Sequence, residues 1–361
     1  MIRTKQSKVL TITLTVTVAA LVVFIAKEVK AGSWNGKNDP ENMEKETLGE
    51  FGAYKYNYDS LPKSGRLSKQ PWACSFWPTR KQGAAARWHG DVNPVHGKES
   101  GFTLSELRSL SARDMANLSP TEKYDIARCD YNYTLTGEEK DRTANYQSAS
   151  AWAGLCHGWA PAALNYDEPD CANIKNRDGV TIPFYSADIK ALLSLMQGVY
   201  HEEEDSYQVG TKNIGINFFS NGNDVNPGAL HVILANRIGR FDKGFCGEMD
   251  PGMEIWNHPI EGFQTEELKR SRDSVVVRTT IIYPDDEPKL ATERALNNGR
   301  GDESFRNKEV LEYKLDLDRN GNITGGSYIS GVKPDFLWSA SRAPFKGIFK
   351  ELAPIYEKSI K

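Results

Sequence analysis

Pro161 places the tightest constraint on the local fold of this chain. It follows Cys156 by five positions, inside the segment GLCHGWAP at residues 154–161. Proline has no backbone N–H and is tolerated in an α-helix only in the first turn. If residues 161–166 are helical, the helix must begin within about four residues before Pro161. We therefore expect Cys156 at, or just before, the positive N-terminal end of this helix.

A cysteine in that position is a candidate nucleophile. Free N–H groups and the helix dipole stabilise a thiolate, and the same groups can bind the oxyanion formed when the thiolate attacks a carbonyl. Gly154 and Gly158 leave room for a substrate backbone beside the thiol. The residue types fit equally well a buried inert thiol, or one half of a disulfide with Cys171.

A thiolate mechanism needs a histidine to hold the proton and a third group to orient that histidine. His231 lies at the start of an apolar run of strand length, LHVILANRI at residues 230–238, and we expect it to face a cleft at the mouth of a core strand. The alternative is a hydrogen-bonded core histidine. His157 adjoins Cys156 on the starting helix, where adjacent side chains point apart, and is a poor candidate base.

Asp250 is the candidate orienting carboxylate, because it follows His231 by 19 residues. A strand, a short loop and a neighbouring antiparallel strand would bring the two side chains together, and Asp250 could then accept the imidazole N–H and set its tautomer. Glu248 has the same side-chain parity along that strand and is the rival. The alternative for Asp250 is a turn residue that caps its own backbone before Pro251 and Gly252.

Helical patterns precede strand patterns along the chain. Capping boxes begin at Thr103 and Ser119, and an Asn320-Gly321 turn follows a strand-like segment. The expected helices lie near residues 104–117, 120–128 and 186–196, and the expected strands at 230–238, 274–283 and 311–317, the last continuing as a hairpin from residue 323. This order predicts an α+β domain whose antiparallel sheet packs against helices.

The N-terminus is typical of an export signal. Basic residues in positions 1–8 precede an uncharged apolar stretch of 18 residues at 9–26, and cleavage after Ala31 fits the small-residue rule. Eighteen residues are also at the lower limit for spanning a bilayer. Residues 1–31 are thus predicted to be a signal peptide or a signal anchor that attaches the protein to a membrane through residues 9–26. Both place the protein outside the cytoplasm, as a periplasmic, secreted or membrane-anchored protein.

Residues 32–70 are polar with little periodicity, and we expect an extended N-terminal lead-in there. No clean linker divides the remainder, so residues 71–361 are predicted to form one catalytic domain. The net charge of −3 and the pI of about 6.1 argue against a nucleic-acid partner. Four cysteines besides Cys156 allow three disulfide pairings or none, and they are Cys74, Cys129, Cys171 and Cys246.

No cofactor or metal site is predicted. Residues 316–327 begin like a calcium loop, but Ser327 occupies the twelfth position, where a bidentate glutamate is needed. The alternating pattern before Asp316 favours a strand and hairpin turn instead.

Four segments together resemble the transglutaminase-elicitor family, which comprises secreted oomycete cell-wall transglutaminases and bacterial relatives. They are GLCHGWAP (154–161), VTIPF (180–184) before DIKALL (188–193), DPGMEIWN (250–257) and KPDFLW (333–338). The resemblance covers most of residues 60–345. It implies a papain-like α+β fold, with the cysteine at a helix N-terminus packed on an antiparallel sheet.

The resemblance also implies an activity and its residues. Cys156 would be the nucleophile, His231 the base and Asp250 the orienting carboxylate, and the spacing between the last two favours Asp250 over Glu248. The expected reaction joins protein glutamine carboxamides to lysine or other small primary amines. Trp152 and Trp159 could wall the cleft.

Two other functions fit the same residues. A cysteine peptidase or amidase on this scaffold would use water as the acceptor, and solvent exclusion from the cleft would decide between the two acceptors. A non-catalytic binding module would be insensitive to Cys156→Ala and would leave the thiol inert to iodoacetamide at neutral pH.

Overall fold

The computed structural model describes residues 34, 36–89, 95, 97–98, 101–144, 148–201, 207–212, 224–249, 252, 254–285, 293–296, 303–331 and 333–360. The expected export signal at residues 1–31 lies outside this set, as does Asp250. Within the described ranges, no helix is both long enough and apolar enough to cross a membrane.

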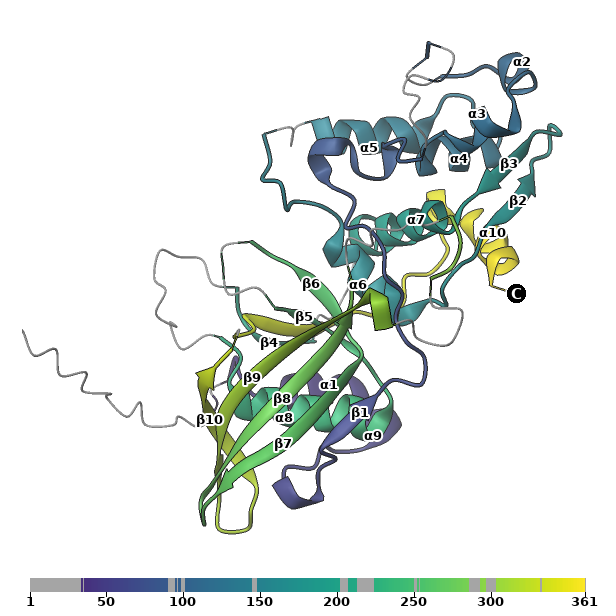
Figure 1. The fold of residues 1–361 in the computed structure, drawn as a ribbon. Helices are drawn as coiled ribbons and strands as arrows, with labels where there is room; N and C mark the ends of the chain where they lie inside the picture. Colours follow the sequence, from purple (N-terminus) through teal and green to yellow (C-terminus); the bar gives the residue numbers. More distant parts are fainter. Residues whose placement is uncertain are drawn as a thin grey trace, which may run out of the picture. The chain divides into compact units, whose positions relative to one another are not determined.

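Most helices lie in the first half of the chain and most strands in the second half (Figure 1). The α-helices are α1 (Glu41–Phe51), α2 (Leu104–Leu107), α3 (Ala112–Ala116), α4 (Pro120–Ala127), α5 (Thr134–Ala144), α6 (Cys156–Asn165), α7 (Ser186–Val199), α8 (Pro227–Ile233), α9 (Gly239–Phe241) and α10 (Leu352–Ser359). The strands are β1 (Ser64–Arg66), β2 (Ala172–Lys175), β3 (Thr181–Phe184), β4 (Tyr207–Gly210), β5 (Phe245–Glu248), β6 (Asn257–Ile260), β7 (Gly262–Arg270), β8 (Ser274–Pro284), β9 (Arg306–Leu317), β10 (Ile323–Ser330) and β11 (Phe336–Ser339).

The strands form three sheets in which the described pairs are antiparallel. The largest has the order β1-β7-β8-β9-β10, the second β4-β11-β5-β6, and the third is the β2-β3 hairpin. Glu261 alone separates β6 from β7 in the chain and so joins the two larger sheets. Its buried carboxylate accepts from Arg66 at 2.7 Å and from Arg306 at 2.8 Å, which holds this junction in place.

Two apolar clusters form the core. One gathers side chains from α4, α6, α7, the β2-β3 hairpin and α10, including Cys156 and Trp159. The other gathers α8, the inner faces of the larger sheets and residues near the N-terminal helix, including Met43 and Tyr313. Mixed helices and antiparallel sheets thus make up the described chain, in agreement with the α+β prediction.

Several expected elements are confirmed by the structure. Both capping boxes form, at Thr103 with Glu106 and at Ser119 with Glu122. The helix expected at 186–196 is α7, and the strand expected at 274–283 is β8. The hairpin of β9 and β10 turns where expected, and Asp318 closes that turn by accepting from the backbone of Asn320 and Asn322, each at 2.8 Å.

Other expectations are wrong. Residues 104–117 form two helices, because Ser111 caps a new helix by accepting from the N–H of Asp114. Residues 41–51 form α1 rather than an extended lead-in, with Met43 fully buried, and β1 joins the largest sheet.

The run at 230–238 is helical, not a strand. It comprises the end of α8 and the π-helix η4 (Leu234–Ile238). Asn226 accepts from the N–H of Gly228, and Pro227 occupies the first helical position. These two start signals outweigh the β-branched composition of the run.

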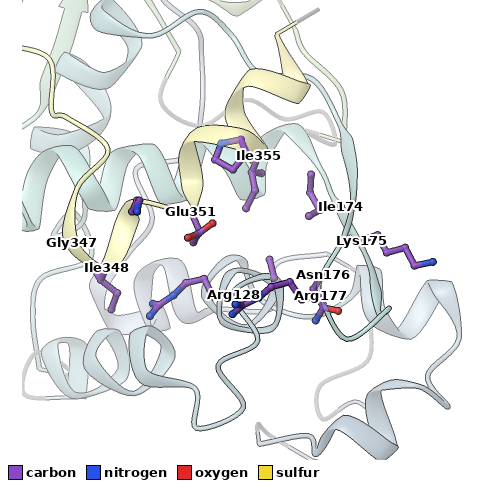
Figure 2. Close-up of a pocket in the computed structure, with 12 residues that line it drawn as sticks. Arg128, Ile174, Lys175, Asn176, Arg177, Gly347, Ile348, Glu351 and Ile355 are labelled. Atoms are coloured by element: carbon purple, nitrogen blue, oxygen red, sulfur yellow. The ribbon is translucent and has the colours of Figure 1, made fainter.

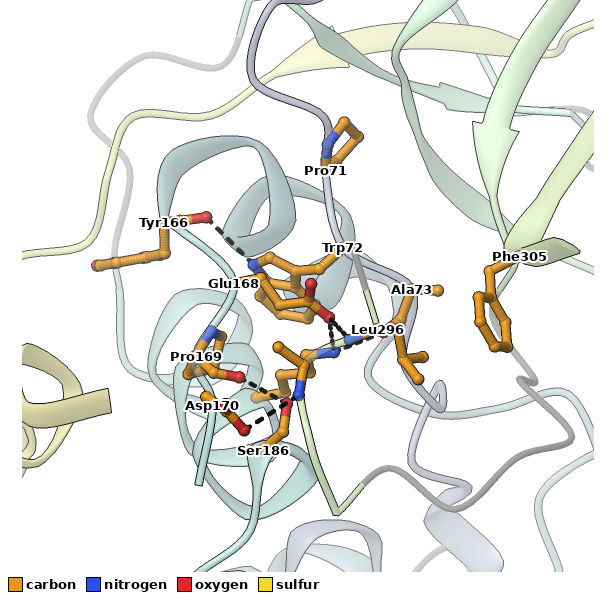
Figure 3. A network of polar contacts seen from close by, with 12 residues as sticks. Pro71, Trp72, Ala73, Tyr166, Glu168, Pro169, Asp170, Ser186, Leu296 and Phe305 are labelled. Carbon is orange, nitrogen blue, oxygen red and sulfur yellow. Dashed lines mark hydrogen bonds and ion pairs between the residues drawn. The ribbon is translucent and has the colours of Figure 1, made fainter. Parts of the chain in front are cut away.

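A short segment of the β8–β9 connection, residues 293–296, is held against the helical half of the molecule. The N–H of Leu296 donates to Glu168 at 2.8 Å (Figure 3). The same carboxylate oxygen pairs with Lys190 at 2.5 Å, and the Lys190 side chain is fully buried. A buried ion pair therefore anchors this segment.

Candidate active site around Cys156

Helix α6 begins at Cys156, and Leu155 is its N-terminal cap residue. Pro161 lies inside the helix as its sixth residue, beyond the first turn where a proline is expected, so the helix begins one residue earlier than the proline rule predicts. The Leu155 carbonyl accepts from the N–H groups of Gly158 and Trp159, at 2.9 and 2.8 Å, so intrahelical bonding starts directly after the thiol. The thiol therefore lies at the positive end of the helix dipole.

The loop before α6 is tied to the segment at residues 76–79. The N–H of Leu155 donates to the Phe76 carbonyl at 2.6 Å, and the N–H of Thr79 donates to the Ala153 carbonyl at 2.8 Å. A Cβ atom on Gly154 would approach the Phe76 oxygen to 2.3 Å. Glycine is required at position 154 because the two backbones touch, and this contact sets the position of the helix start.

Gly158 allows a similar close backbone contact between α6 and α7. A Cβ atom there would lie 2.1 Å from the carbonyl oxygen of Ser194 and 3.0 Å from the Cα atom of Gly198, both on α7. The two helices thus cross backbone to backbone at a glycine pair. This close crossing supports the turn that carries Cys156.

The Cys156 sulfur has two described polar neighbours, both reached from β6 and the residues before it. The thiol lies 3.4 Å from the Ile255 carbonyl, to which it can donate, and the Asn257 side-chain amide donates to the sulfur at 3.7 Å. The indole N–H of Trp338 donates to Asn257 Oδ1 at 2.8 Å. Because an indole N–H can only donate, this bond fixes Oδ1 away from the thiol and turns the amide N–H groups toward it.

These contacts act on the two states of the thiol in opposite ways. The Ile255 carbonyl favours the protonated S–H group, whereas the Asn257 amide and the helix N-terminus favour negative charge on the sulfur. The site therefore holds the thiol in a defined direction and supplies donors for the thiolate. Sequence reasoning missed Asn257, which it noted only as part of the 250–257 motif.

A cavity of about 410 Å³ opens beside the thiol. It is lined by Thr79, Arg142, Trp152, Ala153, Gly154, Cys156, His157, Ile255 and Asn257. Trp152 lines it as expected. Trp159 does not, since it is fully buried and donates its indole N–H to the Trp72 carbonyl at 3.1 Å.

Two cationic or titratable side chains belong to the cavity wall. Arg142 is held by Glu139 through bonds of 2.6 and 2.8 Å, and Glu139 is buried. His157 packs its ring against Gly198. Enclosure of the ring by protein atoms, and secondarily the Arg142 charge, lower the pKa of His157, so the ring is neutral near pH 7.

His231 is the fifth residue of α8 and belongs to the other apolar cluster. Its Nδ1 atom and the Tyr313 hydroxyl are 2.9 Å apart, and its ring stacks on Tyr58 with centroids 5.7 Å apart. Burial lowers the pKa of His231 to about 3. None of its described contacts is with Cys156, and none of these neighbours lines the cavity. The expectation that it lies at the mouth of a strand is wrong, and its role as base stays a prediction from the family resemblance.

Of the two candidate orienting carboxylates, the structure describes Glu248 but not Asp250. Asp250 lies outside the described residues, and its role stays a prediction. Glu248 is buried at the end of β5, directly opposite Asn257 in the ladder between β5 and β6. Its carboxylate accepts from the N–H of Trp256 at 3.2 Å. Glu248 thus supports the strand that carries Asn257.

The remaining titratable groups lie elsewhere. His258 follows Asn257 on β6, packs edge-on against Trp159, and has its pKa lowered to about 4 by burial. Cys74, Cys129 and Cys171 are free thiols. Across the described ranges, no three His, Cys, Asp or Glu side chains are grouped so that they could hold a metal ion.

The protein is an α+β protein with a thiol site, because its helices pack on antiparallel sheets and a cysteine lies at the start of α6. Comparison with family models identifies the family: residues 48–283 match the transglutaminase elicitor family. The chain belongs to that family, as the sequence resemblance predicted.

Comparison with solved structures gives a fold match. The chain is similar to the GP42 transglutaminase from Phytophthora sojae, with a TM-score of 0.67 and 20% sequence identity. The match covers 90% of this chain and 98% of the GP42 chain. Comparison with curated proteins yields no match.

Proposed function

We propose that this protein is a transglutaminase that transfers the acyl group of a glutamine carboxamide to a primary amine through a thioester on Cys156. Membership of the transglutaminase elicitor family supports the activity. The observation that carries the choice of nucleophile is the Cys156 thiol, which lies at the start of α6 and lines an open cavity. Its substrates would be proteins bearing glutamine and lysine, or small amines.

The proposed reaction has two halves. In the first, the thiolate forms a C–S bond with the carboxamide carbon, the carbonyl π electrons move to oxygen, and the tetrahedral intermediate collapses with cleavage of the C–N bond. The departing nitrogen takes a proton from an imidazolium and leaves as ammonia. In the second, an amine attacks the thioester carbon, its proton passes to the imidazole, and the thiolate is released.

Asn257 would act on the sulfur in both halves. Its amide N–H stabilises the thiolate before attack and again when the C–S bond breaks. A backbone N–H at the start of α6, ahead of Gly158, is the candidate donor for the oxyanion. The Trp338 bond holds the Asn257 amide in the useful orientation without reorganisation.

Two imidazoles compete for the role of proton carrier. The family resemblance assigns it to His231 with Asp250, whereas His157 lines the same cavity as the thiol. The pH profiles of His157→Gln and His231→Gln separate them. Replacing the proton carrier should lower kcat of the thioester-forming step and remove the pH dependence of that step. Replacing a histidine with a purely structural role should change only the stability of the protein.

The activity is tested by incubating the purified protein with a glutamine-containing peptide and a fluorescent primary amine. We expect amine incorporation that is abolished in Cys156→Ser and retained in the matched control Cys171→Ala, which removes an exposed free thiol. Release of ammonia without incorporation would show an amidase that uses water. An unreactive Cys156 with neither product would contradict both enzymes and leave a binding module.

Export is a separate proposal that rests on residues 1–31 alone. We expect the protein outside the cytoplasm, either cleaved after Ala31 or retained in the membrane through residues 9–26. N-terminal sequencing of the protein recovered from the native host distinguishes the two forms. Recovery of intact protein from the cytoplasm would contradict both.

A further inference from the structure

A hollow of about 550 Å³ lies between the end of α4, strand β2 and the C-terminal helix, away from the Cys156 cavity (Figure 2). Its charged lining is strongly one-sided, with Arg128, Lys175, Arg177 and Lys350 against Glu351. The whole chain carries a net charge of −3, so this concentration of positive charge runs against the overall balance. A cluster of that kind attracts anions.

The charges of these cations are only partly offset by nearby carboxylates, since Arg128 lies near Asp125 and Asp130 and Arg177 near Asp178. Lys175, Arg177 and Lys350 have no ion-pair partner among the described residues. Arg128 lies 3.9 Å from Asp125, too far for a hydrogen bond, and its Nη1 atom is buried without a hydrogen-bond partner in the described part of the chain.

Asp125 makes no hydrogen bond with Arg128, and its oxygens accept from other donors instead. They accept from the N–H of Leu135 at 3.2 Å and from the N–H and hydroxyl of Thr136 at 2.9 and 2.8 Å. The Arg128 guanidinium packs beside the Tyr124 ring, 5.6 Å from its centroid, and is thereby held in place. The Arg128 side chain remains 23% exposed and lines the hollow. The exposed part of an oriented guanidinium is suited to bind an oxyanion.

The walls of the hollow are tied to one another. The Tyr124 hydroxyl on α4 donates to the Ile348 carbonyl at 2.8 Å, which fixes the segment before α10. The Asn176 side chain donates to the Ile126 carbonyl at 2.8 Å, which fixes the end of β2 against α4. Lys358 on α10 donates to the Asn173 carbonyl at 2.6 Å. These bonds hold the hollow open in one shape, so a ligand would meet a preformed site.

The rest of the lining is apolar. Ile174, Ile348, Pro354 and Ile355 contribute hydrocarbon surface, and Figure 2 shows Ile174 and Ile355 beside the charged groups. A bare inorganic ion would leave this surface and most of the volume unused. Pockets of a few hundred Å³ that combine apolar walls with a few convergent polar groups typically hold small organic ligands.

We propose that this hollow binds a small organic anion, in which a phosphate or carboxylate head contacts Arg128 and Arg177 and an uncharged body lies against the isoleucines. The site is separate from Cys156 and does not depend on the acyl-transfer activity. Phosphate and carboxylate share the oxyanion chemistry that a guanidinium fork recognises. Titration with one ligand of each kind distinguishes a phosphate head group from a carboxylate head group.

The test is isothermal titration of the purified full chain with four probes: phenyl phosphate, benzoate, benzyl alcohol and inorganic phosphate. We expect saturable binding of phenyl phosphate or benzoate, the tighter of the two identifying the head group. Inorganic phosphate should bind more weakly than phenyl phosphate by about tenfold, because it lacks the apolar body. Benzyl alcohol should not bind, because it lacks the charge. Equal binding of the alcohol and the anions, or binding of none, would overturn the proposal.

The site is located with paired variants. Lys175→Gln/Arg177→Gln changes two exposed side chains and should weaken the preferred anion at least about tenfold, as should Arg128→Gln. Lys269→Gln/Arg319→Gln removes the same charge from exposed positions on the largest sheet and its turn, and should bind as the unchanged protein does. Cys156→Ala should also bind normally. Undiminished binding in Lys175→Gln/Arg177→Gln, or loss of binding in Cys156→Ala, would contradict this location.

Discussion

At the scale of single residues, the site depends on the orientation of one amide. Asn257 accepts from Trp338 and donates to the Cys156 sulfur, so it stabilises the thiolate without being charged. We predict that Asn257→Asp lowers the rate of Cys156 alkylation by iodoacetamide at pH 7 by about tenfold or more. The new carboxylate repels the thiolate and cannot donate to it, and about 1.4 kcal/mol corresponds to tenfold.

Two further variants make this prediction specific. Asn257→Ala removes the donor without adding charge and should lower the rate less, by about threefold to fivefold, since one modest hydrogen bond is lost. Trp338→Phe leaves the Asn257 amide in place but no longer fixes its orientation. The alkylation rate of Trp338→Phe should therefore lie between the rates of Asn257→Ala and the unchanged protein. If Asn257→Asp reacts as fast as the unchanged protein, the amide has no effect on the thiolate.

These residues also show what the sequence could predict. The proline rule predicts a helix start near Cys156, and α6 does begin there, although Pro161 itself lies inside the helix beyond its first turn. Asn257 lies 101 positions from Cys156, and their contact depends on how β6 meets α6. A single sequence contains no local signal for such a contact. The element that carries His231 differs from its prediction for another reason, because local start signals at residues 226–228 determine a helix there.

At the scale of elements, the crossing of α6 and α7 at Gly158 supports the site. We predict that Gly158→Ala destabilises the protein by about 3 kcal/mol, since the added methyl would meet the Ser194 carbonyl at 2.1 Å and force the helices apart. Gly137→Ala is the matched control. It lies within α5 with nothing within 4 Å of its Cβ position, and should stabilise the protein by about 0.5–1 kcal/mol. Urea unfolding measures both, and equal effects would contradict the close crossing.

The helix that carries His231 explains why element type is hard to predict from composition. The run at residues 230–238 is mostly apolar and contains Val232, Ile233 and Ile238, which favour strands. However, α8 begins at a capped Asn226-Pro227 step and packs against β9 and β10. Tertiary packing supports a β-branched helix here. The Asn-Pro-Gly start signals at residues 226–228 favour a helix, and in this protein they outweigh the composition of the run.

The anchored segment at residues 293–296 gives a second prediction for elements. Glu168→Ala would leave Lys190 charged, buried and without its carboxylate, and we expect a loss of about 3–5 kcal/mol together with faster proteolysis of residues 293–296. Glu168→Leu/Lys190→Met removes both charges and should recover most of the stability but not the protection of the segment. Recovery of both would show that the Leu296 contact with Glu168 does not hold the segment.

At the scale of the whole molecule, buried neutral imidazoles make stability depend on pH. Burial lowers the pKa of His231 to about 3 and of His258 to about 4, so both rings stay neutral in the folded protein at pH 5. In the unfolded chain they titrate near 6.5. Unfolding therefore takes up two protons below that pH, and the stability that these rings contribute is complete above pH 6.5 and is lost as the pH falls toward 4.

Asp125 makes the stability of the folded protein increase, not decrease, as the pH falls. Burial raises its pKa to about 6, so the folded protein binds this proton more tightly than the unfolded chain does, and stability rises as the pH falls through 6. Between pH 7.5 and pH 5, each histidine should cost about 2 kcal/mol and Asp125 should return about 1.4 kcal/mol. We therefore predict that these three groups lower the free energy of unfolding by about 3 kcal/mol over this range.

Replacing a buried histidine and replacing Asp125 should change the pH dependence of the free energy of unfolding in opposite directions. His258→Gln should flatten the decrease between pH 7.5 and 5 by about 2 kcal/mol, and Asp125→Asn should steepen it by about 1.4 kcal/mol. The Asn variant will be less stable at every pH, because its amide group meets the N–H donors of Leu135 and Thr136, but only the difference between the two pH values is compared. Urea unfolding at both pH values measures this difference. An unchanged pH dependence in His258→Gln would mean that this imidazole is protonated in the folded protein, and the neutral core inferred around β6 would be wrong.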